Sequence, residues 1–300
     1  MINKKFREQK ETIISYFNNR KNIVFTKNML HAILFDYRSK WNAGINLGIN
    51  DFLKFLEEEC GLQQVVLEFP KHNINRYVFK KDISPYKIAC SIKSSGYFSH
   101  YSAMFLNGLT EQIPQSIFFN IEQSDKSSFS YNNLTQDQID KAFSKEPKLT
   151  NQIAQYNEYK LHLLTGKFTG NLGVINLEEQ EVDQIQVTGL ERTLIDIAVR
   201  PNYSGGIYEV LKAYEKAHSY VSINKLSAIL EKINFIYPYH QVIGFYLEKT
   251  GKYTENQLNI MKSFETKHNF YLTHNMINPK FSKTWKLFYP SNFQPFLSGN

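Results

Sequence analysis

Three stretches in the first third of the chain carry apolar residues at the spacing of an amphipathic helix. Residues 3–19, 27–37 and 49–59 each place apolar side chains three or four positions apart, so each can bury one face. Thr26 precedes the second stretch as a predicted N-cap, because its hydroxyl can accept a backbone N–H of the first turn. Gly61 follows the third stretch and predicts its end. The pattern therefore predicts three short helices in succession.

Two strand-like runs follow the third helix and enclose a polar segment. QQVVLEF (63–69) and YVFKK (77–81) are rich in branched and aromatic residues, and PKHNINR (70–76) lies between them. This arrangement predicts a β-hairpin with a polar tip. Three helices followed by a hairpin is the order of a winged helix-turn-helix. In that fold the third helix enters the major groove of DNA and the wing contacts the backbone or the minor groove.

Two sets of polar residues are the candidate DNA contacts in this interpretation. They are Asn46, Asn50, Asp51 and Lys54 at the start of the third helix, and Lys71, His72, Asn73, Asn75 and Arg76 at the hairpin tip. An amide can pair with adenine, whereas lysine and arginine neutralise phosphates. The acidic run 57–59 at the far end of the third helix fits base reading only if that end faces away from DNA. A winged helix that binds protein alone is the alternative.

The distribution of charge supports a nucleic-acid-binding head. The chain has a formal net charge of +7, and residues 1–88 hold 15 Lys and Arg against 9 Asp and Glu. The remainder holds 20 basic against 19 acidic residues, so almost the whole excess lies in the first third. A basic module joined to a near-neutral one is the electrostatic pattern of a protein that binds nucleic acid through one end.

The rest of the chain mixes helical and strand-like stretches, so we predict an α+β fold with a winged helix-turn-helix followed by a larger mixed α/β domain. Ser84-Pro85 marks the predicted boundary, which gives a DNA-binding domain over 1–85 and a second domain over 86–300. Strands are predicted at 116–123, 173–177, 269–275 and 284–290, and helices at 151–164, 204–218, 223–233 and 239–251. Residues 122–148 are predicted to be a polar surface excursion.

The sequence offers little that indicates catalysis. It lacks the phosphate-loop, zinc-protease and hydrolase-nucleophile patterns, and Gly166-Lys167 has no glycine five residues before it. Glu158 and Lys160 fit the E-x-K pattern of nucleases that hold Mg²⁺. The segment around them is predicted helical, however, whereas such a site needs the end of a strand. A nuclease-like enzyme is thus a second alternative, and we expect neither a cofactor nor a metal.

Hydropathy and cysteine usage predict a cytoplasmic protein. No apolar run reaches the length of about 18 residues that a membrane helix needs, so no membrane partner is expected. The opening MINKKFREQK is basic and polar, unlike a secretory signal. Cys60 and Cys90 form no CxxC pair and are predicted to be reduced thiols.

Residues 97–114 read as a helix that follows a capping serine. Ser99 is the predicted N-cap, and Gly108 is the predicted stop. Ser99 and His100 could in principle form a nucleophile and its base. Adjacent residues of a helix point about 100° apart, so we expect that these two side chains do not face each other.

Residues 188–206 read as a helix followed by a tight turn. Thr188 and Glu191 predict a capping box, and Arg192 and Asp196 lie four positions apart, where they can pair. Pro201 ends the helix. Gly205-Gly206 then opens the next helix, and we favour a tight turn over an anion site there.

These stretches together resemble the AbiEi family of antitoxins from bacterial abortive-infection (type IV toxin–antitoxin) systems. Residues 99–110 match its S-H-x-S-A-x-x-L-x-G-L-T motif. Residues 191–206 match an E-R-T-L-I-D motif followed by R-P and a glycine pair, and 247–251 match a helix that ends in LE-x-TG. The resemblance extends over most of the chain, and the order of the motifs agrees throughout.

The resemblance implies a phage-defence antitoxin that is also a transcriptional repressor. Its winged-helix head would bind operator DNA, with inverted repeats expected, and repress its own operon. Its larger domain would counteract a nucleotidyltransferase-like toxin, and direct binding of that toxin is not required. The predicted antitoxicity surface comprises Arg192, Asp196, Gly205 and Gly206, where the resemblance is strongest. A protein-interaction adaptor of the same architecture remains the alternative.

Overall fold

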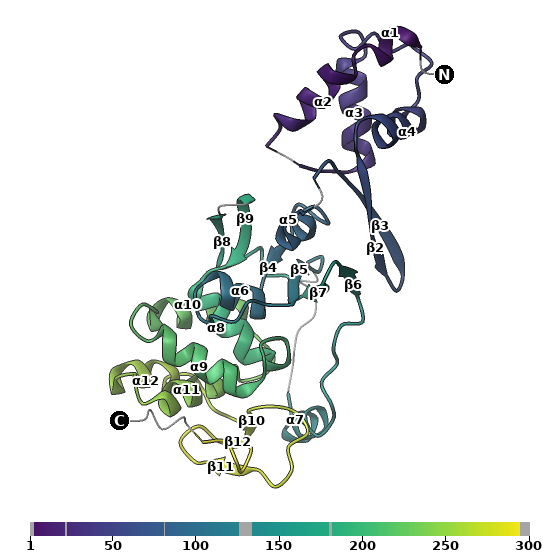
Figure 1. The fold of residues 1–300 in the computed structure, drawn as a ribbon. Coiled ribbons are helices and arrows are strands. Elements are labelled where there is room, and N and C mark those ends of the chain that lie inside the picture. Colours follow the sequence, from purple (N-terminus) through teal and green to yellow (C-terminus); the bar gives the residue numbers. More distant parts are fainter. Residues whose placement is uncertain (1–2, 22, 81, 126–133, 180–181, 295–300) are drawn as a thin grey trace. The chain divides into compact units, whose positions relative to one another are not determined.

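The computed structural model describes residues 3–21, 23–80, 82–125, 134–179 and 182–294, which form an α+β protein (Figure 1). The chain divides into two compact units. The first unit comprises Met1–Gly96 with Asn151–His162 and Glu178–Ile185. The second unit comprises Tyr97–Thr150, Leu163–Leu177 and Gln186–Asn300. The boundary predicted near residue 85 concerns independent folding, and it stays a prediction.

The helices predicted in the first third are present. Their bounds are α1 Lys4–Arg7, α2 Lys10–Asn18, α3 Lys27–Tyr37 and α4 Ile49–Glu59. The stretch 3–19 thus forms two helices, with a turn at Glu8-Gln9 between them. The Thr26 hydroxyl accepts the backbone N–H of Met29 at 3.2 Å, which confirms the predicted N-cap of α3. Gly61 has φ +81°, a left-handed conformation that ends α4 at little steric cost.

A three-stranded antiparallel sheet contributes to the core of the first unit. Its strands are β1 Val24–Phe25, β2 Gln63–Phe69 and β3 His72–Val78, in the order β1-β3-β2. Phe6, Phe17, Trp41 and Phe52 lie buried among the helices. Short α5, Pro85–Cys90, comes next, with a proline in its first turn as helix starts favour.

Residues 151–164 form a hairpin, and the helix predicted there is wrong. Strands β6 Ile153–Tyr156 and β7 Tyr159–Gly166 pair antiparallel, with Tyr156 opposite Tyr159. The two-residue turn between them begins with Asn157 at φ +50°, a conformation that asparagine tolerates in tight hairpin turns. The buried Ala154 and Tyr156 lie on either side of the exposed Gln155, which is the period of a strand.

The second sheet has six strands in the order β6-β7-β5-β4-β9-β8. The remaining strands are β4 Tyr97–Phe98, β5 Ser116–Glu122, β8 Val174–Glu179 and β9 Val182–Thr188. Strand β4 pairs antiparallel with β5 and parallel with β9. The strands predicted at 116–123 and 173–177 are therefore confirmed.

Helices make up most of the remainder of the second unit. They are α6 His100–Leu106, α7 Gln136–Phe143, α8 Leu190–Val199, the 3-10 turn Pro201–Tyr203, α9 Ile207–Ala217, α10 Ile223–Ile233, α11 Tyr239–Thr250 and α12 Glu255–Lys262. After these helices, β10 Phe270–Tyr271, β11 Lys280–Ser282 and β12 Leu287–Tyr289 form a small three-stranded sheet. Within the described residues, no helix combines the length and apolarity needed to span a membrane.

The segment 122–148 is only partly the surface excursion that its polarity predicts. Residues 126–133 lie outside the described residues. Helix α7 follows, with a capping box between Thr135 and Gln138. Ile139 and Phe143 of α7 are buried in the main core of the second unit. Two apolar residues at i and i+4 were enough to bury one face of an otherwise polar helix.

Candidate functional site

The first candidate surface lies where α3 meets the start of α4. Asn50 and Lys54 are exposed on α4. Asn46 is also exposed, but it lies in the turn before α4 and not in the helix, since α4 begins at Ile49. The Lys27 ammonium on α3 donates to Asn50 Oδ1 at 2.8 Å. An amide oxygen accepts two hydrogen bonds, so Asn50 retains capacity for a further partner.

The acidic run 57–59 is partly neutralised by neighbouring cations. Lys54 lies 3.8 Å from the Glu58 carboxylate, one helical turn away. The Arg7 guanidinium lies 3.3 Å from the Glu59 carboxylate. Both pairs are largely exposed, and such pairs stabilise a protein by less than about 1 kcal/mol. The negative charge of this end of α4 is thus reduced locally, while Asn50 at the other end faces solvent.

The hairpin tip is shorter than its polar sequence predicts. Phe69 pairs with His72, so only Pro70 and Lys71 connect β2 to β3. His72, Asn73 and Asn75 therefore belong to strand β3, and these three side chains are exposed. The His72 ring stacks on Phe69, with centroids 5.8 Å apart. Hydrogen bonding along the ladder places the start of β3 at His72, five residues before the predicted apolar run, whereas β2 has its predicted bounds.

Arg76 is not at the tip of the hairpin and does not face solvent. It lies near the other end of β3 and is only 8% exposed. Its Nε donates to the Ser91 hydroxyl at 2.9 Å, and Nη2 donates to the Ser91 carbonyl at 2.6 Å. Nη1 donates to the carbonyl of Asn75 at 2.8 Å. Burial lowers the pKa of the Arg76 guanidinium. The side chain is a structural tie to the segment after α5, which corrects its predicted place among the phosphate contacts.

The second candidate site is in the second unit, where α8 begins. Gly189 is the N-cap of α8, so the capping box predicted for Thr188 and Glu191 is wrong. The Thr188 and Thr193 hydroxyls lie 2.8 Å apart, and Thr193 also donates to the carbonyl of Thr188. Glu191 instead accepts from Lys225 at 2.8 Å. The pattern failed because β9 continues through Thr188 and the helix starts one residue later.

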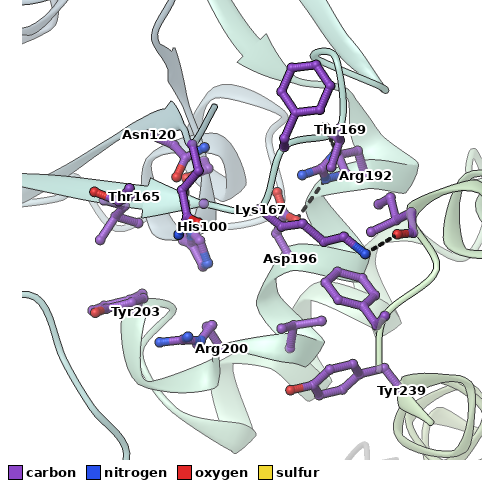
Figure 2. Close-up of a pocket in the computed structure, with 18 of the residues that line it drawn as sticks. His100, Asn120, Thr165, Lys167, Thr169, Arg192, Asp196, Arg200, Tyr203 and Tyr239 are labelled. Carbon is purple, nitrogen blue, oxygen red and sulfur yellow. Dashed lines mark hydrogen bonds and ion pairs between the residues drawn. The ribbon is translucent and has the colours of Figure 1, made fainter. Parts of the chain in front are cut away.

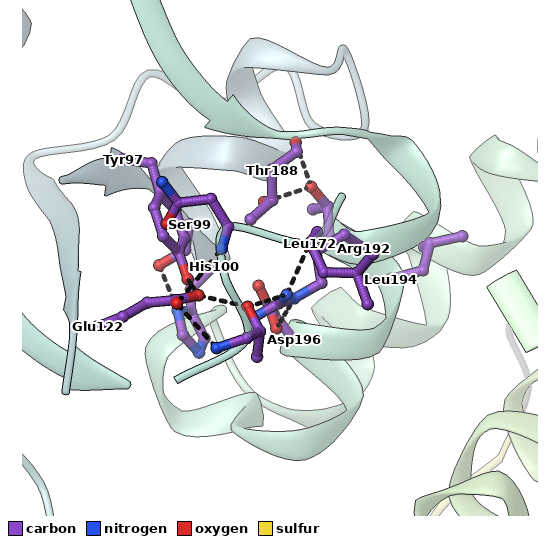
Figure 3. A network of polar contacts seen from close by, with 12 residues as sticks. Tyr97, Ser99, His100, Glu122, Leu172, Thr188, Arg192, Leu194 and Asp196 are labelled. Atoms are coloured by element: carbon purple, nitrogen blue, oxygen red, sulfur yellow. Dashed lines mark hydrogen bonds and ion pairs between the residues drawn. The ribbon is translucent and has the colours of Figure 1, made fainter. Parts of the chain in front are cut away.

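Arg192 and Asp196 pair as their spacing predicts, but they do so inside the protein. Arg192 Nε lies 2.8 Å from Asp196 Oδ1, and the two residues are 6% and 7% exposed (Figure 3). Arg192 Nη1 also donates to the Leu172 carbonyl at 2.7 Å and to the Thr169 hydroxyl at 3.2 Å. Burial raises the pKa of the Asp196 carboxyl, and the Arg192 charge opposes that rise. The pair is therefore a buried ion pair that holds the loop 169–172 against α8.

A second carboxylate holds the same loop from the sheet. Glu122 at the end of β5 accepts from the backbone N–H of Thr169 at 2.8 Å and of Asn171 at 3.3 Å. The Tyr97 hydroxyl donates to it at 3.1 Å, and Thr169 Oγ1 also bonds to it. Burial alone would raise the pKa of Glu122, but these hydrogen bonds hold it below its usual range. Figure 3 shows this network converging beside Arg192 and Asp196.

Ser99 and His100 contact each other, contrary to the expectation from helical geometry. Ser99 Oγ lies 2.8 Å from His100 Nδ1. The expectation assumed two helical residues, whereas Ser99 is extended and His100 has φ +53°. A positive φ is uncommon for a residue other than glycine, and such conformations cluster at functional sites. Burial, with the charges of Arg200 and Arg192, lowers the pKa of His100 to about 3. His100 is therefore neutral at physiological pH.

These residues form part of the wall of a pocket of about 930 Å³ that lies wholly within the second unit (Figure 2). Five cationic side chains and two carboxylates line it: Lys148, Lys167, Arg192, Arg200, Lys232, Asp125 and Asp196. Its other polar lining includes Asn120 and His100, and Tyr203, Tyr237 and Tyr239 contribute aromatic faces. The volume falls in the usual range for small-molecule sites, about 300–1,000 Å³.

Two of the pocket cations are committed to the fold. Arg192 is held by Asp196, as described above. Lys167 donates to the carbonyls of Ile233 at 2.8 Å and Asn234 at 2.7 Å. Asn234 ends α10 in the left-handed conformation, so the lysine neutralises the negative end of that helix dipole. Burial lowers the pKa of Lys167.

The four predicted antitoxicity residues divide between two places. Arg192 and Asp196 line the pocket, whereas Gly205 and Gly206 are not among its lining residues. The glycines have φ +78° and +91°, and the Gly206 N–H donates to the Pro201 carbonyl at 2.9 Å. A Cβ on Gly205 would come within 2.8 Å of Glu209 Cγ. The glycine pair is thus a tight turn before α9, as the sequence favours over an anion site.

Several of the pocket residues carry no signal in the sequence. Asn120, Lys148 and Lys232 come from a separate strand, loop and helix, and none belongs to a recognisable motif, whereas Tyr203 lies within the matched stretch 191–206. Lys167 stood out only through an incomplete phosphate-loop pattern. Glu158 and Lys160 lie at the β6–β7 hairpin. In the part of the chain that the structure describes, no three His, Cys, Asp or Glu residues gather as a metal site would require.

Comparisons with known proteins identify the fold. No protein-family model matches the chain, and no curated protein matches its sequence. Among solved structures, the chain is similar to the RV2827C protein from Mycobacterium tuberculosis, with a TM-score of 0.60 and 14% sequence identity. The match covers 94% of this chain and 91% of that protein. The likeness therefore shows a shared α+β fold over nearly the whole length of both proteins.

Proposed function

We propose that the protein is a cytoplasmic DNA-binding antitoxin that represses its own operon. The first unit would bind operator DNA, and the second would oppose a nucleotidyltransferase-like toxin. The observation that carries the DNA-binding part is the exposed start of α4, where Asn50 lies against Lys27 of α3 at 2.8 Å. An amide next to a cation offers base pairing and phosphate neutralisation at one place.

The hairpin supports the same proposal as a winged-helix wing. Lys71 lies at its turn, and His72, Asn73 and Asn75 are exposed on the adjoining strand. The order of three helical segments and a hairpin fits a winged helix-turn-helix. Arg76 has no part in this set, because its guanidinium is bonded within the first unit. The basic excess of residues 1–88 supplies the long-range attraction to DNA.

The antitoxin part of the proposal is supported by the resemblance to the AbiEi family. Its motifs match residues 99–110 and 191–206, and in this structure they form α6, α8 and the turn before α9. Because Arg192 and Asp196 are buried, any surface that opposes a toxin would have to use their exposed neighbours. The motif residues themselves would position that surface from within.

A DNA-shift assay on the full chain tests the DNA-binding part. The probe is the DNA upstream of the protein's own reading frame, with random DNA of equal length for comparison. We expect specific binding that weakens steeply as salt rises, because neutralised phosphates release counterions. Asn50→Ala should reduce the preference for the specific probe. Lys71→Ala should reduce the affinity for both probes by the same factor. Lys283→Ala, an exposed lysine of the second unit, is the matched control.

Growth rescue against the product of the adjacent toxin gene tests the antitoxin part. Asn50→Ala and Lys71→Ala should weaken repression and keep rescue, because both residues lie in the first unit. Loss of rescue in both variants, with melting curves unchanged, would contradict a division of labour between the units. Equal binding of both probes by the unaltered protein would contradict the repressor.

A further inference from the structure

The pocket of the second unit exposes cations that the fold does not use. Lys148, Arg200 and Lys232 are exposed at the pocket, and none of the three forms an ion pair with another described residue. Arg200 Nη1 donates only to the carbonyl of Lys148, at 3.2 Å. Two carboxylates also line the pocket, Asp125 and Asp196, and Asp196 forms an ion pair with Arg192. The excess of positive charge favours an anionic ligand.

Asn120 brings a side-chain amide to the same pocket. It lies on β5, lines the pocket and is 5% exposed. Its side chain makes no hydrogen bond to any residue that the structure describes. Gly166 packs against it so closely that a Cβ there would lie 2.8 Å from both amide heteroatoms. Its amide lines the pocket, where a polar group of a ligand can bond to its oxygen and its N–H groups.

His100 adds a neutral hydrogen-bonding group beside Asn120. Figure 2 shows His100, Asn120, Arg200 and Tyr203 around one space. The His100 ring meets Tyr203 edge to face, with centroids 5.4 Å apart, and Ser99 holds Nδ1. When the Ser99 hydroxyl donates to Nδ1, the ring carries its proton on Nε2 and can donate from there. The tight turn at His100, with its positive φ, is what orients this ring.

Aromatic side chains supply the remaining component of the pocket. Tyr203, Tyr237 and Tyr239 line it, and the rings of Tyr237 and Tyr239 meet edge to face at 6.2 Å. Aromatic faces stack on nucleobases, and a basic surface next to such faces is the usual chemistry for binding nucleotides. An amide with both a donor and an acceptor is suited to the edge of a base.

We propose that this pocket binds a nucleotide. Arg200, Lys148 and Lys232 would hold the phosphates, and a tyrosine face would stack on the base. Asn120 would bond the edge of the base. The inference goes beyond the proposed DNA and toxin functions and does not rest on them, because the lining residues all belong to the second unit.

Calorimetric titration of the full chain, purified free of nucleic acid, tests this proposal. The ligands are the four common ribonucleoside triphosphates and monophosphates, the matching nucleosides, ribose 5-phosphate and inorganic phosphate. We expect at least one nucleotide to bind with a Kd below about 1 mM. The nucleosides and the two ligands that lack a base should bind at least about tenfold more weakly.

Substitutions then locate the site. Arg200→Ala should reduce the affinity for the nucleotide about tenfold, as the loss of a charged hydrogen bond predicts. Asn120→Ala should reduce the preference among bases. Lys232→Ala reports independently on the phosphates, and it replaces Arg200→Ala if that variant fails to fold by its melting curve. Lys283→Ala, exposed and outside the pocket, is the control.

Three results would overturn the proposal. One is no heat of binding for any nucleotide at about 1 mM. Another is equal affinity for inorganic phosphate and nucleotides, which would leave a simple anion site. The third is unchanged nucleotide affinity in folded Arg200→Ala and Lys232→Ala. Failure of DNA binding or of toxin rescue would leave all three measurements unaffected, so the two proposals fail separately.

Discussion

The outer surface of α4 and the pocket of the second unit use similar polar residues in opposite physical situations. On α4, Asn50 and Lys54 are exposed. Asn50 accepts from Lys27 and Lys54 pairs with Glu58, and such exposed contacts contribute little to the free energy of folding. In the pocket wall, Arg192 and Asp196 are buried and bonded to each other and to a loop. Charges in water are free to exchange partners, whereas buried charges must keep theirs. The α4 residues can therefore exchange their partners for those of a ligand, whereas the Arg192–Asp196 pair is a rigid part of the pocket wall.

The largest expected effect is the loss of stability when Arg192 is replaced. Arg192→Ala leaves the Asp196 carboxylate buried without its partner and frees the Leu172 carbonyl, so the free energy of unfolding should fall by about 3–5 kcal/mol. Lys54→Ala on α4 should change it by less than about 0.5 kcal/mol. Urea unfolding of both variants measures the contrast. Equal stability of Arg192→Ala and the unaltered protein would mean that the pair is not buried in solution.

Arg76 and Lys71 give the same contrast between a buried and an exposed cation within the first unit. Arg76→Ala removes the donors that satisfy the Ser91 carbonyl, so unfolding should become easier by about 1–3 kcal/mol. Lys71→Ala, five residues away at the hairpin turn, should leave stability unchanged. Denaturation of both variants gives the comparison. A stable Arg76→Ala protein that has lost only DNA affinity would restore arginine to the phosphate contacts.

Acid should weaken the pocket frame through His100. Burial lowers the pKa of His100 to about 3, whereas the unfolded chain binds that proton near pH 6.5. The contribution of the neutral ring is therefore complete above about pH 6.5 and is lost as pH falls toward 3, by at most about 1.4 kcal/mol per pH unit. Unfolding free energies at pH 7, 6 and 5 measure this slope.

His100→Asn isolates the histidine in that experiment, because asparagine tolerates the positive φ. Its stability should fall less steeply with acid than that of the unaltered protein. His240, whose pKa burial lowers to about 4, contributes equally to both proteins and cancels in the difference. Identical slopes for the two proteins would show that His100 takes up its proton as readily folded as unfolded.

The smallest expected effect is on the slope of DNA binding against salt. Lys71→Ala should reduce that slope by about one, the contribution of one phosphate contact. Shift assays at three salt concentrations measure the slope, and Lys283→Ala should reproduce that of the unaltered protein. A Lys71→Ala slope unchanged within error would remove the hairpin turn from the DNA interface.

The sequence by itself determined the elements whose evidence is local. Helices α3, α4 and α10 begin and end within a residue of their apolar patterns, since caps and helical spacing act over one or two turns. Thr26 and Gly61 were identified correctly because each acts on its own neighbours. The α+β class followed from the succession of such elements.

Only the tertiary structure decided which polar residues are buried and which meet. Arg76 and Asn75 are neighbours in sequence and equally polar, yet pairing in the sheet and the position of Ser91 bury one and expose the other. Residues 151–164 became a hairpin because the Asn157 turn and a place in a six-stranded sheet outweighed the helical pattern. The pocket joins Asn120, Lys148 and Lys232 from distant segments. Burial and long-range pairing depend on where the whole chain goes, and no local pattern contains that information.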